Sequence, residues 1–150
     1  MSIAEICINL NQKNMIYQKQ IILPEYKRGF SLISDIILKE IDFFPEIGIL
    51  NLFLKHTSAA LSLNENADPD VRNDFESFIS RLIPESQVDY IHNSEGADDM
   101  PAHIKSSLFG TSINIPITNY RLNIGTWQGI YLCEFRNSGG RREILATIYY

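Results

Sequence analysis

The spacing of apolar residues changes along the chain, and this change limits the fold more than any other feature. Strands place apolar side chains at every second position or in short continuous runs, whereas helices space them three or four positions apart. Strand-like and helical segments alternate in the first two thirds of the 150 residues, and the last third is strand-like throughout. Consecutive strands without an intervening helix favour antiparallel pairing. We therefore predict an α+β fold with an antiparallel or mixed sheet and a few helices packed on it.

The predicted strands differ in how much of each is buried. They cover residues 15–23, 47–55, 61–63, 113–117, 129–136 and 142–150. The nearly continuous apolar run at 47–55 predicts a strand that is covered on both faces. Pro116 indicates that its strand lies at a sheet edge. The Asn-Ser-Gly-Gly segment at 137–140 predicts a hairpin between the last two strands.

Helices are predicted at three places. Residues 30–41 carry apolar side chains at helical spacing, with Ser31 as the N-cap. A second helix begins at Asp68-Pro69, where aspartate can cap free N–H groups and proline suits the first turn, and it ends before Pro84. The third covers residues 102–109 and ends at Gly110, a residue suited to a left-handed C-cap.

Length and charge restrict the class of protein. A chain of 150 residues that is 45% hydrophobic fits one domain, residues 1–150. A net charge of −5 argues against nucleic acid and anionic membranes as partners, because both attract basic surfaces. The first residues do not resemble a signal peptide, and Cys7 and Cys133 predict reduced, packed thiols rather than a disulfide framework. These features favour a cytoplasmic location.

Polar side chains gather in three stretches at the ends of predicted elements, residues 56–68, 90–105 and 125–129. Loops at such positions commonly hold functional side chains. All three histidines, His56, His92 and His103, fall in the first two stretches. Three imidazoles could bind a divalent metal, zinc first and magnesium or calcium as alternatives, and leave a position for water or substrate. Their spacing matches no compact metal signature, so hydrogen-bonded structural histidines are the competing interpretation.

Other polar residues also have two interpretations. Asp68 suits a helix cap as well as a ligand site, and Trp127 suits core packing as well as stacking on a ligand. Lys105 could pair with a phosphate or face solvent. Thr57 and Ser58 lie beside His56 but outside any GxSxG elbow, so a hydrolytic triad has little support.

Three segments carry a resemblance to a known family. They read HTSAALSLNENADPDVRNDFESFISRLIP (56–84), YIHNSEGADDMPAHIKSSLFGTS (90–112) and GTWQGIYLCEFRNSGGRREI (125–144). These motifs resemble the YjbQ-type family, which is associated with secondary thiamine-phosphate synthase activity, and the similarity runs from about Gly29 to the C-terminus. The first 15 residues are the part least tied to the pattern.

The resemblance implies a homotrimer with a bound metal and a weak thiamine-phosphate synthase activity. That reaction joins a hydroxymethylpyrimidine diphosphate to a thiazole phosphate and releases pyrophosphate. Carried onto this sequence, the motif residues give His56, His92 and His103 as metal ligands and Glu65, Asp99 and Lys105 as catalytic residues. The substrate-binding residues implied in the same way are Thr57, Ser58, Asn64, Asp68, Thr126, Trp127 and Gln128.

Two hypotheses from different classes follow. The first is a metal-dependent enzyme acting on a small phosphorylated molecule, either by thiamine-phosphate-synthase-like transfer or by metal-assisted hydrolysis. The second is a non-catalytic trimeric protein that binds a metal or ligand and whose histidines are structural.

Overall fold

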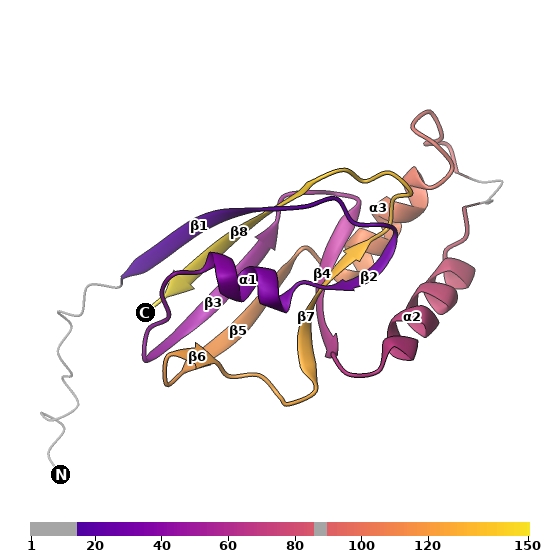
Figure 1. Cartoon of the computed structure of the whole chain (residues 1–150). Coiled ribbons are helices and arrows are strands. Elements are labelled where there is room, and N and C mark those ends of the chain that lie inside the picture. Colours follow the sequence, from indigo (N-terminus) through magenta and orange to yellow (C-terminus); the bar gives the residue numbers. More distant parts are fainter. Residues whose placement is uncertain (1–14, 86–89) are drawn as a thin grey trace, which may run out of the picture.

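Two antiparallel sheets form the frame of the protein in the computed structural model, which describes residues 15–85 and 90–150. The large sheet has the strand order β1 (Ile16–Leu23), β8 (Arg142–Tyr149), β3 (Ile47–Leu54), β5 (Ser112–Thr118) and β6 (Arg121–Leu122). The small sheet has the order β2 (Gly29–Leu32), β7 (Gln128–Glu134) and β4 (Ala59–Glu65). Figure 1 shows both sheets with α1 (Ser34–Glu40), α2 (Pro69–Leu82) and α3 (Asp99–Phe109). The predicted α+β fold is confirmed.

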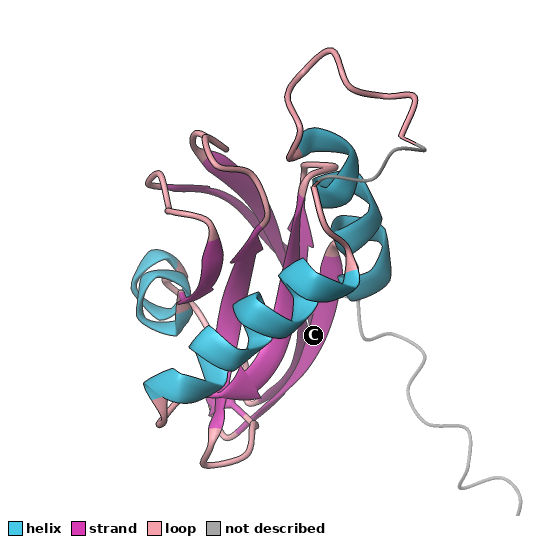
Figure 2. Cartoon of the chain, turned by 90° about the vertical axis from the view of Figure 1, so that its right-hand side faces the viewer, coloured by secondary structure: helices cyan, strands magenta, loops and turns pink. Residues whose placement is uncertain are grey.

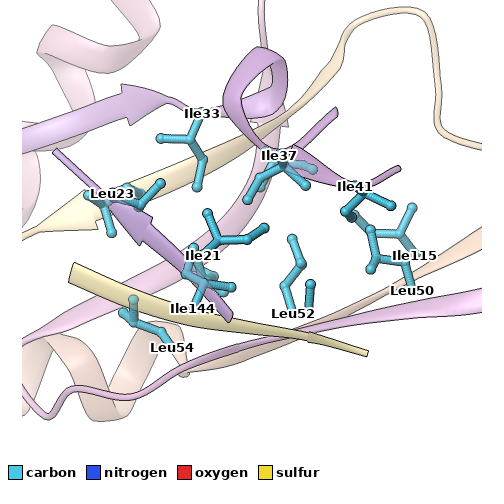
Figure 3. Packing of buried hydrophobic residues seen from close by; sticks show 14 of the residues in the cluster. Ile21, Leu23, Ile33, Ile37, Ile41, Leu50, Leu52, Leu54, Ile115 and Ile144 are labelled. Atoms are coloured by element: carbon cyan, nitrogen blue, oxygen red, sulfur yellow. The ribbon is translucent and has the colours of Figure 1, made fainter. Parts of the chain in front are cut away.

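The small sheet is the middle layer of the molecule. One of its faces packs with α1 and the inner face of the large sheet, in a core that includes Ile37, Leu52 and Leu132. Figure 3 shows Ile37 and Leu52 in this core. Its other face packs against α2 and α3 through a second core that includes Tyr131 and Cys133. In Figure 2, α1 and α3 accordingly lie on opposite sides of the strands.

Strand β7 is buried on both faces because it lies inside this sandwich. All of its residues after Gln128 are buried, and alternate side chains enter the two cores. Burial raises the pKa of the Cys133 thiol to about 12, since the apolar surroundings disfavour a thiolate. Cys133 is a free, buried cysteine, as predicted, and Cys7 lies outside the described residues.

The ends of α2 and α3 agree with the capping signals in the sequence. The Asp68 carboxylate accepts a hydrogen bond from the backbone N–H of Asp70, and Pro69 occupies the first turn of α2. Helix α3 begins at Asp99, three residues earlier than predicted, and ends at Gly110 with φ of 91°. A residue with a side chain would be strained in this left-handed conformation, which is why glycine suits the position.

The helix predicted at residues 30–41 is wrong in its first third. Residues Gly29–Leu32 form β2, and only Ser34–Glu40 are helical, so Ser31 is not a helix cap. Phe30 pairs with Cys133 on β7 and packs in the second core. Tertiary pairing therefore overrides the helical spacing at this end of the segment, while Ile33 and Ile37 pack as predicted.

The hairpin predicted between the last two strands is also wrong. The segment at 137–140 does turn the chain, but β7 belongs to the small sheet and β8 to the large one. β7 pairs with β2 and β4, whereas β8 pairs with β1 and β3. The turn therefore connects two layers.

The expectation that the strand at 47–55 is covered on both faces fails for the single chain. Leu50, Leu52 and Leu54 are buried, but Ile47 is 74% exposed and Phe53 44% exposed. The exposed side chains alternate with the buried ones and lie on the outer face of the large sheet.

Among the described residues, no helix is long and apolar enough to cross a membrane.

Candidate functional site

Two of the three histidines meet around one buried carboxylate. Asp99 Oδ2 lies 2.7 Å from His92 Nε2 and 3.2 Å from His103 Nε2. One potential ligand atom from each residue lies within 4.8 Å of the other two. The Asp99 side chain is 2% exposed, whereas those of His92 and His103 are 44% and 32% exposed. The cluster is thus open to ligands on its histidine side.

The fold fixes two members of this cluster, Asp99 and His103, from outside. Asp99 and His103 are spaced four residues apart in the first turns of α3, which puts their side chains on the same face of the helix. The Thr57 carbonyl oxygen lies 3.0 Å from His103 Nδ1, where it accepts the ring N–H and leaves Nε2 facing Asp99. Arg136 contacts the other carboxylate oxygen of Asp99 through its guanidinium.

Arg136 also holds the loop that precedes α3 in place through hydrogen bonds. Its guanidinium donates to Asp98 Oδ2 at 3.0 Å and to the Glu95 carbonyl oxygen at 2.8 Å. Burial alone would raise the pKa of Asp98, but hydrogen bonds from the Asn137 N–H and from Arg136 outweigh it and lower that pKa. Gly96, with φ of 112°, gives the loop a left-handed conformation that favours glycine.

His56 lies outside this cluster. Its Nε2 accepts a hydrogen bond of 2.8 Å from the backbone N–H of Glu143, so this nitrogen is already engaged. Burial and the nearby charge of Arg142 lower the pKa of His56, because both disfavour the charged ring. Of the three predicted ligands, the structure therefore brings together His92 and His103 and gives His56 a backbone contact instead.

A groove of about 680 Å³ adjoins the cluster at His103. It lies where β3 ends, β4 begins and α3 ends. Its lining includes Lys55 and three residues that carry hydroxyl groups, Thr57, Ser107 and Thr111. Lys55 pairs with Glu143 at 2.7 Å, and both side chains are about two-fifths exposed, so a ligand can compete for the ammonium group.

The remaining predicted residues do not join this site within one chain. Asn64, Glu65, Trp127 and Gln128 line a separate pocket at the far end of β4. A strand rises about 3.3 Å per residue, so the two ends of β4, at Ala59 and Glu65, are about 20 Å apart. The polar residues of the three stretches therefore form two separate groups in the structure.

Lys105, Thr126, Ser58 and Asp68 have contacts of other kinds. The Lys105 side chain is buried, and its Nζ has no hydrogen-bond partner among the described residues and lies 6.0 Å from the Phe135 ring centroid. The Thr126 carbonyl accepts from Asn66, Ser58 Oγ accepts from Arg142 at 3.3 Å, and Asp68 caps α2. The catalytic assignments of Glu65 and Lys105 stay predictions.

The donor atoms of the histidine cluster fit a divalent metal. Two imidazole Nε2 atoms and one carboxylate oxygen are a ligand set that catalytic zinc sites use, with a further position left for water or substrate. The hydrogen bond at His103 Nδ1 is the kind of outer contact that orients a ligating ring. The contact of Arg136 with the second oxygen of Asp99 leaves Oδ2 available to an ion.

Sequence reasoning missed the basic residues that support these polar groups. Arg136 holds Asp98 and Asp99, and Arg142 makes two hydrogen bonds of 2.7 Å to the fully buried Glu134. Adjacent aspartates at the start of a buried helix need a cationic or N–H partner, and that need could have pointed to a nearby arginine. Nothing in the sequence tells which arginine lies in reach.

Comparison with known proteins places these features in a family. A family model described as UPF0047 protein YjbQ-like matches residues 19–150. The chain belongs to the YjbQ-like UPF0047 family. The predicted resemblance is thereby confirmed, and the match begins ten residues before Gly29, within β1.

Three proteins to which this chain is similar are matched along nearly their whole length. UPF0047 protein YjbQ of Escherichia coli O157:H7 is 52% identical over 136 residues, which cover 89% of this chain and 98% of that protein. A crystal structure of a YjbQ/UPF0047 family protein from Clostridium acetobutylicum is 35% identical, with a TM-score of 0.75 over 88% of this chain and 99% of that one. A YbjQ-like protein from Sulfolobus solfataricus P2, 24% identical, shares the fold with a TM-score of 0.77 over 91% of this chain and 98% of that one.

Proposed function

We propose that this YjbQ-like protein is a metal-dependent enzyme that acts on a small phosphorylated molecule. The observation that carries the proposal is the convergence of His92, Asp99 and His103 on one point next to a groove. His103 belongs to both the cluster and the groove lining, so a substrate in the groove reaches the metal ligands directly.

In this proposal the metal is a divalent cation, zinc first, held by His92, Asp99 and His103. Such an ion supplies a Lewis acid that polarises a phosphoryl oxygen or activates a bound water. Thr57 fixes the ring orientation of His103, and Arg136 fixes Asp99. Lys55 and the hydroxyl groups of Thr57 and Thr111 hold the phosphate of the substrate in the groove.

Two reactions fit this arrangement. The first is thiamine-phosphate-synthase-like transfer, in which pyrophosphate leaves and a thiazole phosphate takes its place. The second is metal-assisted hydrolysis. Hydrolysis is favoured by the state of the arginines, because Arg136 and Arg142 are both engaged by carboxylates and do not offer a free guanidinium to a diphosphate.

The first test is the metal content of protein purified without added metal. We expect a stoichiometric divalent metal, lost in His103→Ala and in Asp99→Asn. His56→Gln is the matched control, because His56 is a histidine of the same region outside the cluster, and it should keep the metal. Metal-free wild-type protein, or equal loss in the control, would contradict the proposed site.

The second test is turnover by the metal-loaded protein. The pyrimidine diphosphate and thiazole phosphate are supplied together and separately, and the release of pyrophosphate and phosphate is measured. Release that depends on the metal and disappears in His103→Ala supports an enzyme. A metal-loaded protein without turnover on any phosphorylated compound supports the non-catalytic metal-binding alternative.

We also propose that the protein assembles as a homotrimer through the outer face of the large sheet. Ile16, Ile47, Ile49 and Tyr149 are exposed together at one end of that face, where Tyr149 of β8 pairs with both Ile16 and Ile49. Contiguous apolar patches of this kind are uncommon on monomers and mark interaction surfaces. Light scattering should give about three times the chain mass of 17.2 kDa, and Ile47→Glu should reduce it to the single-chain mass. A wild-type protein with the single-chain mass would contradict the trimer.

A further inference from the structure

The pocket at the far end of β4 contains an exposed tryptophan beside a carboxylate that has no ion-pair partner in the described part of the chain. It has a volume of about 490 Å³ and is lined by Leu63, Asn64, Glu65, Trp127 and Gln128. Trp127 is the single tryptophan of the chain and is 66% exposed. Tryptophan is normally well buried, so a large indole face left in water at a pocket wall indicates a binding surface.

The loop that carries Trp127 is held rigidly. The Asn66 amide donates to the carbonyl oxygen of Gln128 at 3.1 Å, and the Asn66 backbone N–H donates to that of Trp127 at 2.8 Å. The Gln128 side chain accepts from the Gly125 N–H at 2.8 Å, and the Gln128 N–H donates back to the Gly125 carbonyl at 2.9 Å. The backbone at Trp127 is therefore held in place before any ligand arrives, which lowers the entropic cost of binding.

Glu65 gives the pocket its charge. The backbone of Glu65 is fixed, because its carbonyl oxygen accepts a hydrogen bond from the Tyr131 hydroxyl. Glu65 also pairs with Gln128 of the neighbouring strand β7. None of the described residues forms a hydrogen bond or ion pair with the Glu65 carboxylate. Of the described residues that line the pocket, Glu65 alone carries a charge, so the pocket repels phosphate and attracts cations.

We propose that this pocket binds a small organic cation, with the positive group over the Trp127 face and next to the Glu65 carboxylate. An indole is the best aromatic partner for a cation, and the attraction increases when the cation is partly desolvated. The side-chain amide N–H groups of Asn64 and Gln128, which donate to none of the described residues, would bind an oxygen of the same ligand. The proposal goes beyond the metal site and does not depend on it, since the two lie at opposite ends of β4.

Trp127 itself reports binding, because it is the source of all tryptophan fluorescence. We would titrate the full chain with choline and with methylguanidinium, and expect a saturable change in emission with a dissociation constant in the millimolar range. The neutral isostere of choline, 3,3-dimethyl-1-butanol, should bind at least about fivefold more weakly, because it lacks the cation–π and ionic attraction. Inorganic phosphate should produce no saturable change.

Variants separate the pocket from the metal site. Glu65→Gln should weaken choline binding about threefold, the effect of removing one partly exposed charge. The matched control Asp74→Asn removes an exposed carboxylate on α2 and should leave choline binding unchanged. Trp127→Leu, followed by calorimetry, should weaken binding on the order of tenfold.

The decisive comparison is between choline and its neutral isostere, which share a shape and differ in charge. Equal binding of choline and its neutral isostere would overturn the proposal, as would the absence of a saturable signal with either cation. His103→Ala should bind choline like the wild type while it loses metal. Failure of the metal proposal would thus leave choline binding intact, and failure of this proposal would leave the metal content intact.

Discussion

Removal of Glu134 should destabilise the protein more than any change on its surface. Glu134 at the end of β7 is fully buried, and Arg142 at the start of β8 is 4% exposed. Arg142 donates two hydrogen bonds of 2.7 Å to the two carboxylate oxygens, and the Arg136 N–H donates a third at 2.9 Å. The pair therefore joins the small sheet to the large sheet at the point where the chain crosses between them.

The magnitude follows from what Glu134→Ala leaves behind. The Arg142 guanidinium would stay buried with Ser58 Oγ at 3.3 Å as a remaining partner. An uncompensated buried charge of this kind costs about 3–5 kcal/mol. Since small domains are stable by only about 5–15 kcal/mol, the variant should lose a large part of its free energy of unfolding.

Urea unfolding at fixed protein concentration measures this loss of stability. Two further variants show whether the unpaired buried charge causes it. Glu134→Leu combined with Arg142→Met removes both charges and should recover all but about 1 kcal/mol, the value of the hydrogen bond that Arg136 still lacks. Glu143→Gln breaks the exposed pair with Lys55 and should cost less than about 1 kcal/mol. A cost of Glu134→Ala as small as that of Glu143→Gln, or a double variant no more stable than the single one, would refute the reasoning.

Three further predictions concern other buried or half-buried groups. Lys105→Met should raise the free energy of unfolding, measured in urea, by about 1–3 kcal/mol, because a charged amine is costly inside the core. Burial, and then the charge of Arg28, lower the pKa of this amine for the same reason. A loss of stability would show that the ammonium group has a partner. His56 has a pKa lowered from 6.5, so the unfolded chain binds its proton more readily than the folded protein, and the stability present above pH 6.5 is lost as the pH falls through the lower folded value. Unfolding free energies measured across that range should fall less steeply for His56→Gln than for the wild type, and identical slopes would contradict this linkage. Ile37→Ala should cost about 2–5 kcal/mol in thermal or urea unfolding, since Ile37 is fully buried between α1 and the large sheet; a cost under about 1 kcal/mol would show that the core collapses around the gap.

The parts of the fold that the sequence predicted are those decided by local interactions. Asp68 caps α2 through an atom two residues away, and Gly110 ends α3 through its own backbone conformation. The strand at Ile16–Leu23 follows from its own alternation of side chains. The errors arose where contacts with residues far away in the chain decide the local structure. Phe30 is in a strand because β7 lies beside it, and β7 and β8 separate because each finds better partners in a different sheet.

The predictions about the candidate site succeeded and failed for the same reason. The residue types and motifs in the sequence were enough to identify the family and to name His92 and His103 as ligands and Asp99 as a catalytic residue among the candidates, because these side chains carry recognisable chemistry. The sequence could not tell that His56 turns its ring to the backbone of Glu143, or that Glu65 and Trp127 lie at the other end of β4, a strand about 20 Å long, from the groove at His103. Proximity between residues far apart in the chain depends on sheet order and register, and these are set by packing of the whole molecule. The sequence by itself determined which groups are available for chemistry, and the tertiary structure alone decided which of them share a site.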